Sequence, residues 1–178
     1  EINPNYGNTF FNLAKLFYDQ GKLKDAELSY RKAIKLNPSF TDAYYNLGNL
    51  FFDLNKLKDA EFSYRKAIQF NPNFTAAHYN LGRISIDLGK LKNAELSYRK
   101  AIELNPNLAI CHANLGDLLR DLGKLKDSEF HTRKAIEINP NYAIAHSNLG
   151  NILKDLGKLK NAELSYRKAI ELNPSFTD

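Results

Sequence analysis

One residue type recurs at a fixed interval and has a chemistry suited to binding. Asparagine stands at five positions, each 34 residues after the last: Asn12, Asn46, Asn80, Asn114 and Asn148. A primary amide both donates and accepts hydrogen bonds. If equivalent residues stack along the molecule, these amides form a ladder that can hold an extended peptide by its backbone, with little regard for its sequence. The alternative is that each amide bonds between adjacent helices.

A second column of residues at the same interval is acidic. Its members are Asp19, Asp53, Asp87, Asp121 and Asp155. Each is expected near the C-terminus of a helix, where an acid opposes the helix macrodipole, so a basic group should offset it. One candidate is the lysine three residues further on, such as Lys22 after Asp19. The other candidate is a basic ligand.

Aromatic residues accompany these columns in the N-terminal half of the chain. Phe11, Tyr45 and Tyr79 directly precede asparagines, and Tyr18 and Phe52 directly precede aspartates. The corresponding positions in the C-terminal half hold Ala113, Arg120, Ser147 and Lys154. Rigid rings bury area at low entropic cost, so the five aromatics are candidate anchors for a peptide. The alternative is that they pack against the next helix.

The histidines and the single cysteine do not predict a metal site. His78, His112 and His146 recur one per interval, and stacked helices lie ~8–10 Å apart. That spacing is too wide for three rings to meet at zinc, whose ligands lie at ~2.0–2.1 Å. We expect these histidines in the core, His131 on the outer surface, and Cys111 buried and inert. No metal and no cofactor is expected.

The elements that must position these columns follow from the prolines. Six prolines, the only ones in the chain, are spaced 34 residues apart from Pro4 to Pro174. A fixed period of this length indicates one supersecondary unit repeated along a solenoid. Each unit is predicted to contain two helices, the second running from about residue 23 to residue 36 in the first copy, where a proline stops it. The first helix of each unit is expected to have an N-cap residue that precedes it: Asn5, Ser39, Asn73, Asn107 and Asn141. It is expected to end where glycine or asparagine can adopt a left-handed conformation: Gly21, Asn55, Gly89, Gly123 and Gly157.

These residues resemble the tetratricopeptide repeat (TPR). The second unit matches the family pattern with Tyr44, Leu47, Gly48, Phe51, Ala60, Tyr64, Ala67 and Pro72. The resemblance covers the whole chain and implies an all-α right-handed TPR superhelix, an α-solenoid of five 34-residue helix-turn-helix repeats. We expect a single TPR solenoid segment over residues 1–178. Its repeats are 7–40, 41–74, 75–108, 109–142 and 143–176, with 1–6 ending a preceding repeat and 177–178 starting a further one. The fourth unit departs from the pattern at Ser128 and Thr132 and the third at Ser85, so the junction of the third and fourth units is expected to be the softest.

The resemblance also implies a binding site. In TPR arrays the first helices line a concave groove, and the asparagine, aspartate and aromatic columns fall on its lining. The asparagine column resembles that of the O-GlcNAc transferase TPR superhelix. The leading interpretation is a non-catalytic protein–protein interaction scaffold that binds an extended peptide or a partner helix in this groove. Two alternatives stay open: a substrate-delivery arm of a larger, glycosyltransferase-like enzyme, and a self-associating array stacked end to end.

Charge and missing motifs restrict the partner. The net charge is +5, but acids outnumber bases at the groove positions, whereas nucleic acid requires a basic surface. We therefore expect a protein or peptide partner that is neutral or basic rather than acidic, and no nucleic acid. The sequence has no apolar run long enough to span a membrane and no phosphate loop or nucleophile elbow. We expect no membrane partner, no catalysis by this segment and, because it carries no targeting signal, a cytoplasmic location.

Overall fold

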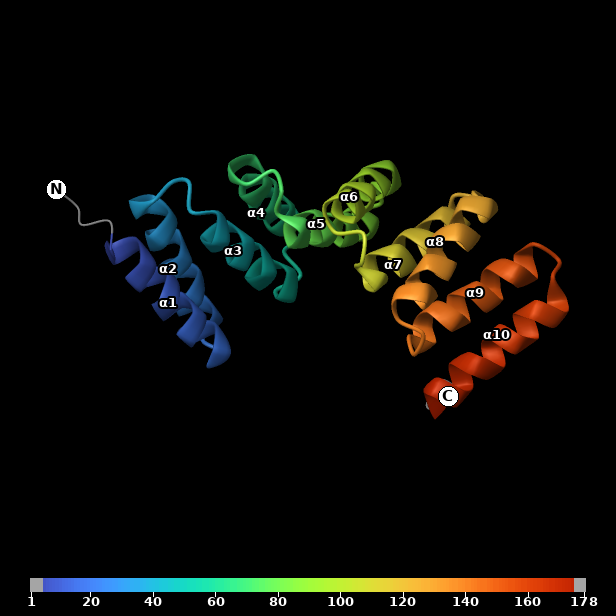
Figure 1. The fold of residues 1–178 in the computed structure, drawn as a ribbon. Helices are drawn as coiled ribbons and strands as arrows, with labels where there is room; N and C mark the ends of the chain where they lie inside the picture. Colours follow the sequence, from blue (N-terminus) through green and yellow to red (C-terminus); the bar gives the residue numbers. More distant parts are fainter. Residues whose placement is uncertain (1–4, 175–178) are drawn as a thin grey trace. The chain divides into compact units, whose positions relative to one another are not determined.

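A computed structural model describes residues 5–174 of the chain (Figure 1). The described residues form ten helices and no strand. The first helices of the repeats are α1 (Asn5–Asp19), α3 (Thr41–Asp53), α5 (Thr75–Asp87), α7 (Ala109–Asp121) and α9 (Ala143–Asp155). The second helices are α2 (Leu23–Leu36), α4 (Leu57–Phe70), α6 (Leu91–Leu104), α8 (Leu125–Ile138) and α10 (Leu159–Leu172).

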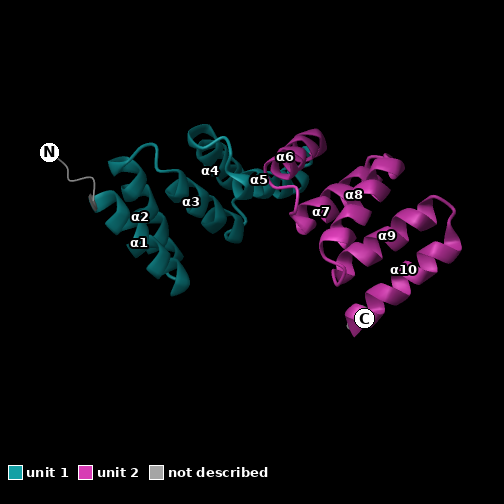
Figure 2. Cartoon of the chain, viewed as in Figure 1, with its two compact units in different colours: residues 1–90 teal, residues 91–178 magenta. Residues whose placement is uncertain are grey.

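The helices fall into two compact units, shown in different colours in Figure 2. Unit 1 spans residues 1–90 and contains α1 to α5, and unit 2 spans residues 91–178 and contains α6 to α10. In unit 1, α1 packs along α2 and α3 along α4, and in unit 2, α7 packs along α8 and α9 along α10. The second helices α2, α4, α6 and α8 also contact the first helix that follows each of them. This nearest-neighbour packing confirms the predicted all-α helical solenoid.

The turns that follow the first helices have the left-handed conformation predicted from the sequence. Gly21 has a φ of 72°, and Asn55 takes the same left-handed conformation with a φ of 55°. Residues with side chains rarely adopt this conformation, and glycine and asparagine tolerate it best. The predicted positions Gly89, Gly123 and Gly157 have φ values of 71°, 72° and 73°. The turn inside each hairpin was therefore predicted correctly.

The predicted N-caps of four first helices are wrong. These helices begin two residues after the predicted cap, and their N-cap residues make no side-chain hydrogen bond to the helix; Asn5 is itself helical. The ordering contact comes instead from the asparagine before each proline. The Oδ1 atom of Asn37 accepts a hydrogen bond from the Ser39 backbone N–H at 3.2 Å, and Asn71 accepts one from Asn73 at 3.1 Å. Asn105 and Asn139 repeat this contact, which is the geometry of an Asx turn.

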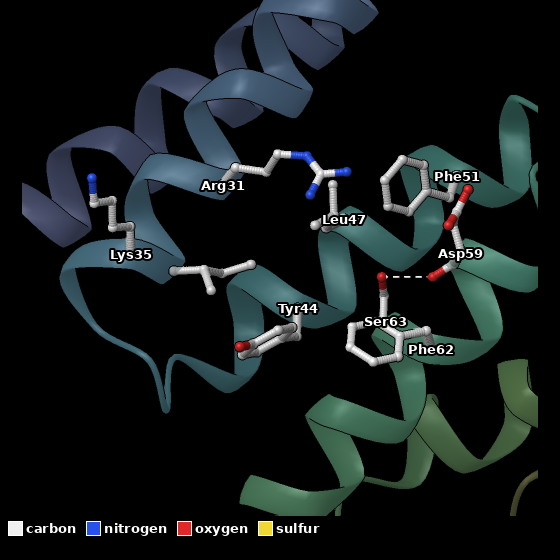
Figure 3. Close-up of a pocket in the computed structure, with 9 residues that line it drawn as sticks. Arg31, Lys35, Tyr44, Leu47, Phe51, Asp59, Phe62 and Ser63 are labelled. Carbon is white, nitrogen blue, oxygen red and sulfur yellow. Dashed lines mark hydrogen bonds between the residues drawn. The ribbon is translucent and has the colours of Figure 1, made fainter.

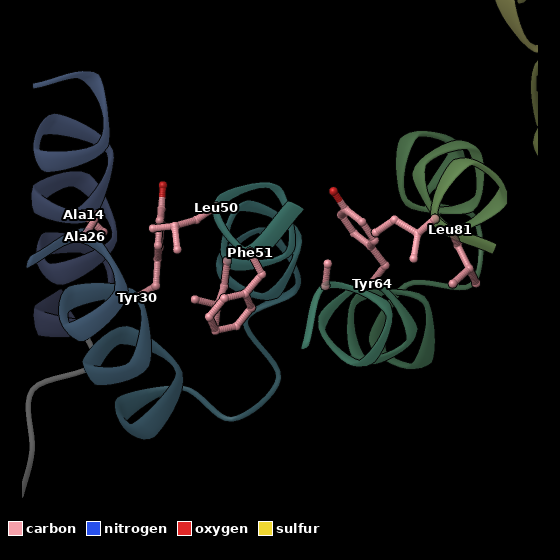
Figure 4. Close-up of a cluster of buried hydrophobic side chains, with 10 residues drawn as sticks. Ala14, Ala26, Tyr30, Leu50, Phe51, Tyr64 and Leu81 are labelled. Atoms are coloured by element: carbon pink, nitrogen blue, oxygen red, sulfur yellow. The ribbon is translucent and has the colours of Figure 1, made fainter. Parts of the chain in front are cut away.

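The core consists of small residues at helix crossings and rings between them (Figure 4). Ala14 and Ala26 are fully buried where α1 meets α2. At the next hairpin, a Cβ atom on Gly48 would lie 2.6 Å from Cε1 of Tyr64, so the bare backbone of α3 forms the surface on which this ring packs. Gly150 and Tyr166 repeat the arrangement in unit 2. In these two hairpins the tyrosine ring therefore packs where a Cβ would overlap it, whereas the first repeat has Ala14 at the equivalent position.

Ion pairs connect each second helix to the hairpin that follows it. Glu61 accepts hydrogen bonds from Arg65 on its own helix and from Lys90 of the next repeat, whose Nζ atom lies 2.6 Å away. Burial alone would raise the pKa of Glu61, but the hydrogen bonds from Lys90 and Arg65 outweigh it and lower this pKa. The ion pair to a lysine of the next repeat recurs at Glu27, Glu95 and Glu129, with Lys56, Lys124 and Lys158 as partners. Junctions between repeats are thus joined by charge as well as by packing.

Candidate functional site

In unit 1 the predicted site residues lie on consecutive first helices, and side chains connect these helices directly. The Tyr18 hydroxyl on α1 donates a hydrogen bond to the Asp53 carboxylate on α3. The guanidinium of Arg83 on α5 stacks 4.7 Å from the centre of the Phe52 ring on α3. We call this surface, formed by α1, α3 and α5, the first-helix face of unit 1.

The three asparagines of the column in unit 1 differ in their surroundings. Asn12 is exposed and makes no hydrogen bond to another described residue. The Nδ2 atom of Asn46 donates to the Asp42 backbone carbonyl at 2.8 Å, which leaves its Oδ1 atom without a partner among the described residues. Asn80 is half-buried, and its Nδ2 atom lies 3.1 Å from Oδ1 of Asn49 and 3.3 Å from the Tyr45 hydroxyl. Asn80 therefore bonds between helices, whereas Asn12 and Asn46 keep hydrogen-bonding capacity for a ligand.

Asn49, which the sequence interpretation did not single out, is the centre of this network. Its Oδ1 atom accepts hydrogen bonds from the Tyr64 hydroxyl at 2.7 Å and from Asn80. The same bond in unit 2 joins the Tyr166 hydroxyl to Asn151 at 2.8 Å. Asparagine occurs here only in the second and fifth repeats. Its pairing with a tyrosine 15 residues later was the available sequence signal.

The aromatic residues at the asparagine column pack between repeats. The ring centre of Tyr45 lies 4.8 Å from that of Phe74 and 5.8 Å from that of Tyr64. Phe11 lies 4.9 Å from Phe40 and 6.0 Å from Tyr30 in the same manner. Tyr79 lies beside Arg83 on the same helix, at 6.0 Å. These rings are half-buried, so part of each faces solvent beside the asparagines.

The predicted lysine partners of the aspartate column are wrong. Lys56 and Lys90 reach the glutamates of the preceding repeat instead of Asp53 and Asp87. The partner of Asp53 comes from the preceding first helix and is Tyr18, whereas Asp121 pairs with Arg120 on its own helix. In unit 2 the pair equivalent to Tyr18 and Asp53 is Arg120 and Asp155, at 3.7 Å. All five aspartates of the column are exposed.

The hydrogen bond from Tyr18 to Asp53 changes the chemistry of the phenol. This bond is the largest cause that raises the pKa of Tyr18 to about 12, and burial and the charges of Asp53 and Asp19 add to it. The hydroxyl therefore stays protonated at neutral pH and acts as a fixed donor. It holds the Asp53 carboxylate in place between α1 and α3.

The first helices of unit 2 carry a different surface. Asn114 and Asn148 are half-buried, and Ala113 and Ser147 replace the rings of unit 1. Arg120 lies 3.6 Å from Asp117 and 3.3 Å from Asp121. Burial is the main cause that raises the pKa of Asp117. The five aromatic residues predicted as anchors all lie on first helices of unit 1.

The histidines at the position of Tyr44 share one contact. The Nε2 atoms of His78, His112 and His146 lie 2.8, 3.1 and 2.9 Å from the carbonyl oxygen of the proline six residues earlier. A carbonyl only accepts, so Nε2 carries the proton in each ring. His112 is buried, as expected for a core histidine, whereas His78 and His146 are half-buried.

His131 was predicted on the outer surface, and this is wrong. It is 8% exposed, and its Nδ1 atom lies 3.1 Å from Nδ1 of His112. His131 occupies the repeat position of Ser29, Ser63, Ser97 and Ser165, which are buried as well. Burial lowers the pKa of His112, and burial together with the charge of His112 lowers that of His131 to about 4.

Cys111 is buried as predicted, and burial raises the pKa of its thiol to about 12. A thiol with so high a pKa is protonated at neutral pH and is a poor nucleophile. Within residues 5–174, no three histidine, cysteine, aspartate or glutamate side chains lie together as a metal site requires. None of the helices in the same range is both long and apolar enough to cross a membrane.

Models of the TPR family match most of the chain. The one described as "TPR repeat" matches residues 14–55 and 116–157, and three described as "Tetratricopeptide repeat" match 41–74 with 143–176, 75–108, and 97–130. The comparison with curated proteins found no match.

Several solved structures share the fold. The crystal structure of MamA protein is 22% identical, with a TM-score of 0.88 over 95% of this chain and 92% of that one. A second MamA structure, from Desulfovibrio magneticus RS-1, is 18% identical, with a TM-score of 0.87 over 97% of this chain and 98% of that chain. YrrB, described as a TPR protein with an unusual peptide-binding site, is 27% identical, with a TM-score of 0.82 over 93% of this chain and 85% of its own. The repeated helical hairpins and the family matches from residue 14 to residue 176 show that the chain belongs to the tetratricopeptide repeat family.

Proposed function

We propose that the chain is a non-catalytic protein-interaction scaffold whose first-helix face in unit 1 binds an extended peptide. Membership of the TPR family and the likeness to YrrB, a TPR protein with a peptide-binding site, support an interaction role. The observation that carries the proposed site is the state of the asparagine column. Asn80 holds neighbouring helices in register, while Asn12 and Asn46 keep amide groups that can pair with a peptide backbone.

The surroundings favour a neutral or basic peptide. The exposed carboxylates of Asp19 and Asp87 lie on this face, and Arg83 is occupied by the Phe52 ring. Half-buried rings beside the asparagines provide apolar contact area without further ordering, since packing between repeats already fixes them. The peptide would therefore gain backbone hydrogen bonds from amides and side-chain contacts from rings.

Selection from a library of displayed random peptides tests this proposal. Selected peptides are then titrated against wild type, an Asn12→Ala/Asn46→Ala variant and an Asn93→Ala variant, with circular dichroism confirming the fold of each. Asn93 is an exposed asparagine on α6 and serves as the matched control. Loss of binding in the double variant alone is expected. Equal binding to all three proteins would contradict the proposal.

A further inference from the structure

Every second helix carries an exposed stripe of lysine, apolar residue and lysine, spaced four residues apart. The stripes are Lys24–Leu28–Lys32, Lys58–Phe62–Lys66, Lys92–Leu96–Lys100, Lys126–Phe130–Lys134 and Lys160–Leu164–Lys168. Residues four apart share one face of a helix. The central side chains are 55–67% exposed, which is high for leucine and phenylalanine. The second helices thus present an apolar residue between two cations to solvent.

In unit 1 this stripe borders a cavity of about 370 Å³ between α2 and α4. We call this cavity the outer groove. Leu47 and Phe51 of α3 form its floor, and Ile34 and Phe62 contribute to its walls. Figure 3 shows Arg31 and Lys35 on α2, Tyr44 and Leu47 on α3, and Phe62 on α4 around the opening. Ligand pockets typically begin at about 300 Å³, so the space suffices for a large apolar side chain.

The charges around the outer groove differ from those in unit 2. In α6, α8 and α10 the second lysine of the stripe is neutralised by a glutamate three residues later, at 2.6–2.7 Å. In unit 1 that later position holds Lys35 in α2 and Gln69 in α4. Lys66 bonds to the neutral Gln69 at 3.0 Å, and Lys35 has no ion pair to any described residue. Asp59 is the carboxylate that lines the groove, and Glu27 occupies Arg31. Lys66 also lies 5.8 Å from the centre of the Phe62 ring, and neither Lys35 nor Lys66 has a carboxylate partner among the described residues.

Unit 2 contains a cavity of the same size that provides an internal comparison. It is also about 370 Å³ and is lined by Arg133, Ile136, Glu137, His146 and Leu149. These residues occupy the repeat positions of Arg31, Ile34, Lys35, Tyr44 and Leu47. At this rim position unit 2 has Glu137, paired with Lys134, and unit 1 has Lys35, which has no ion pair to a described residue. Cavities of equal volume with different charge at the rim should select different ligands.

We propose that the outer groove of unit 1 is a second docking site, specific for an acidic protein segment with a large apolar side chain. That side chain enters between Ile34 and Phe62 and packs on Leu47 and Phe51. Neighbouring carboxylates pair with Lys35 and Lys66. A hollow between helices admits a protruding side chain, whereas a bilayer surface would meet only the exposed stripes, so the cavity favours a peptide over a membrane. The site uses residues of α2, α3 and α4 that the peptide proposed for the first-helix face does not use.

The probe is a fluorescein-labelled hexapeptide of two glutamates, leucine, phenylalanine and two glutamates, followed by fluorescence anisotropy. We expect saturable binding to wild type. Lys35→Glu should weaken it by about fivefold to tenfold, because one exposed ion pair becomes a repulsion. Phe62→Ala should weaken it by about tenfold through lost apolar contact. Phe130→Ala is the matched control, since Phe130 is equally exposed in unit 2, and it should leave binding unchanged.

Four outcomes would overturn the proposal. They are no saturable binding, equal binding to wild type and Phe62→Ala, equal loss in Phe130→Ala, and unchanged binding when serines replace the leucine and phenylalanine of the probe. Cosedimentation with phosphatidylserine-containing vesicles that is lost in Lys35→Glu, without peptide binding, would identify a membrane site instead. The Asn12→Ala/Asn46→Ala variant should bind the probe normally, so failure here is distinguishable from failure of the first-helix site.

Discussion

Acidification from about pH 7.5 to about pH 5 is expected to destabilise unit 2 through the His112–His131 pair. His112 donates Nε2–H to the Pro106 carbonyl, so its Nδ1 atom accepts the proton of His131. Both rings are neutral in this arrangement. A further proton on either ring would charge a buried pair, whereas the unfolded chain takes up protons freely.

The direction and size of this loss of stability follow from the linkage between proton binding and folding. The pKa of His131 falls from its ordinary value of 6.5 to about 4 in the folded protein. Between these values the unfolded state binds more protons, so stability is complete above the unfolded pKa and is lost as the pH falls towards 4. Protonation of His131 in the unfolded chain alone then costs about 2 kcal/mol of stability at about pH 5. The lowered pKa of His112 acts in the same direction.

Charged residues near the pair keep their signs over most of this range. Arg99 and Lys134 lower the pKa values of the two histidines, and Glu95, Asp127 and Glu137 raise them. Carboxylates titrate mainly below about pH 5, so they contribute little to the change between about pH 7.5 and pH 5. The histidine pair therefore causes most of the change in stability between about pH 7.5 and pH 5.

The assay is urea unfolding followed by circular dichroism at a series of pH values. His131→Ser restores the serine found at this position in the other four repeats and should remove most of the pH dependence. His146→Tyr, which copies Tyr44, is the control and should retain the full dependence. An equal loss of stability on acidification in wild type and His131→Ser would refute the reasoning. The quantity compared is the slope of the free energy of unfolding against pH, because His131→Ser also changes packing at every pH.

Three further predictions concern packing and charge. Gly48→Ala should lower the free energy of unfolding by about 1–3 kcal/mol, because the new Cβ overlaps a packed tyrosine ring. Gly7→Ala is the control and should not lower it, because its Cβ would meet no atom closer than 3.8 Å. Urea unfolding compares the two variants. Thr132→Val should raise the free energy of unfolding, measured by urea unfolding, by about 1 kcal/mol, because the Thr132 hydroxyl is buried without a hydrogen-bond partner among the described residues. Glu61→Gln should cost about 1 kcal/mol and reduce the dependence of unfolding on salt, because two ion pairs weaken.

Each of these predictions has a distinct contrary result. Equal stability of Gly48→Ala and Gly7→Ala would show that the Tyr64 ring moves aside without cost. A destabilised Thr132→Val would show that its hydroxyl has a favourable role. An unchanged salt dependence in Glu61→Gln would mean that the junction ion pairs are screened by solvent.

The repeat itself was predictable because the same physical requirements recur in every unit. Gly48 and Tyr64 occur as a pair wherever a ring packs on bare backbone, and Gly21 or Asn55 occurs wherever a left-handed turn is needed. Periodicity amplifies these signals, because most copies keep the same residue type, with exceptions such as Ala14, Asn55 and Thr132. The helix starts were not predicted correctly because two side chains, such as those of Asn37 and Ser39, can each order the turn before a helix. Asn37 bonds to the backbone N–H of Ser39, so the helix begins later than the Ser39 side chain suggested.

The side-chain partners were harder to predict because they depend on contacts between repeats. A lysine three residues after each aspartate looked like a local partner. The glutamate of the preceding repeat takes it instead, because that glutamate is less exposed, with 11% exposure for the Glu61 side chain, and charges interact more strongly away from water. His131 was misplaced although its repeat position is buried in all five repeats, where the others have Ser29, Ser63, Ser97 and Ser165.

The bonds between Glu61 and Lys90, and at the equivalent junctions, make each repeat an interchangeable part. Both partners occupy fixed positions of a single unit, so every duplicated unit brings the acceptor for its successor and the donor for its predecessor. A gene that gains or loses a whole number of 34-residue units therefore creates no mismatched junction. The array can change length in evolution by unequal recombination, without a compensating substitution, while single repeats such as the one with His131 diverge on their own.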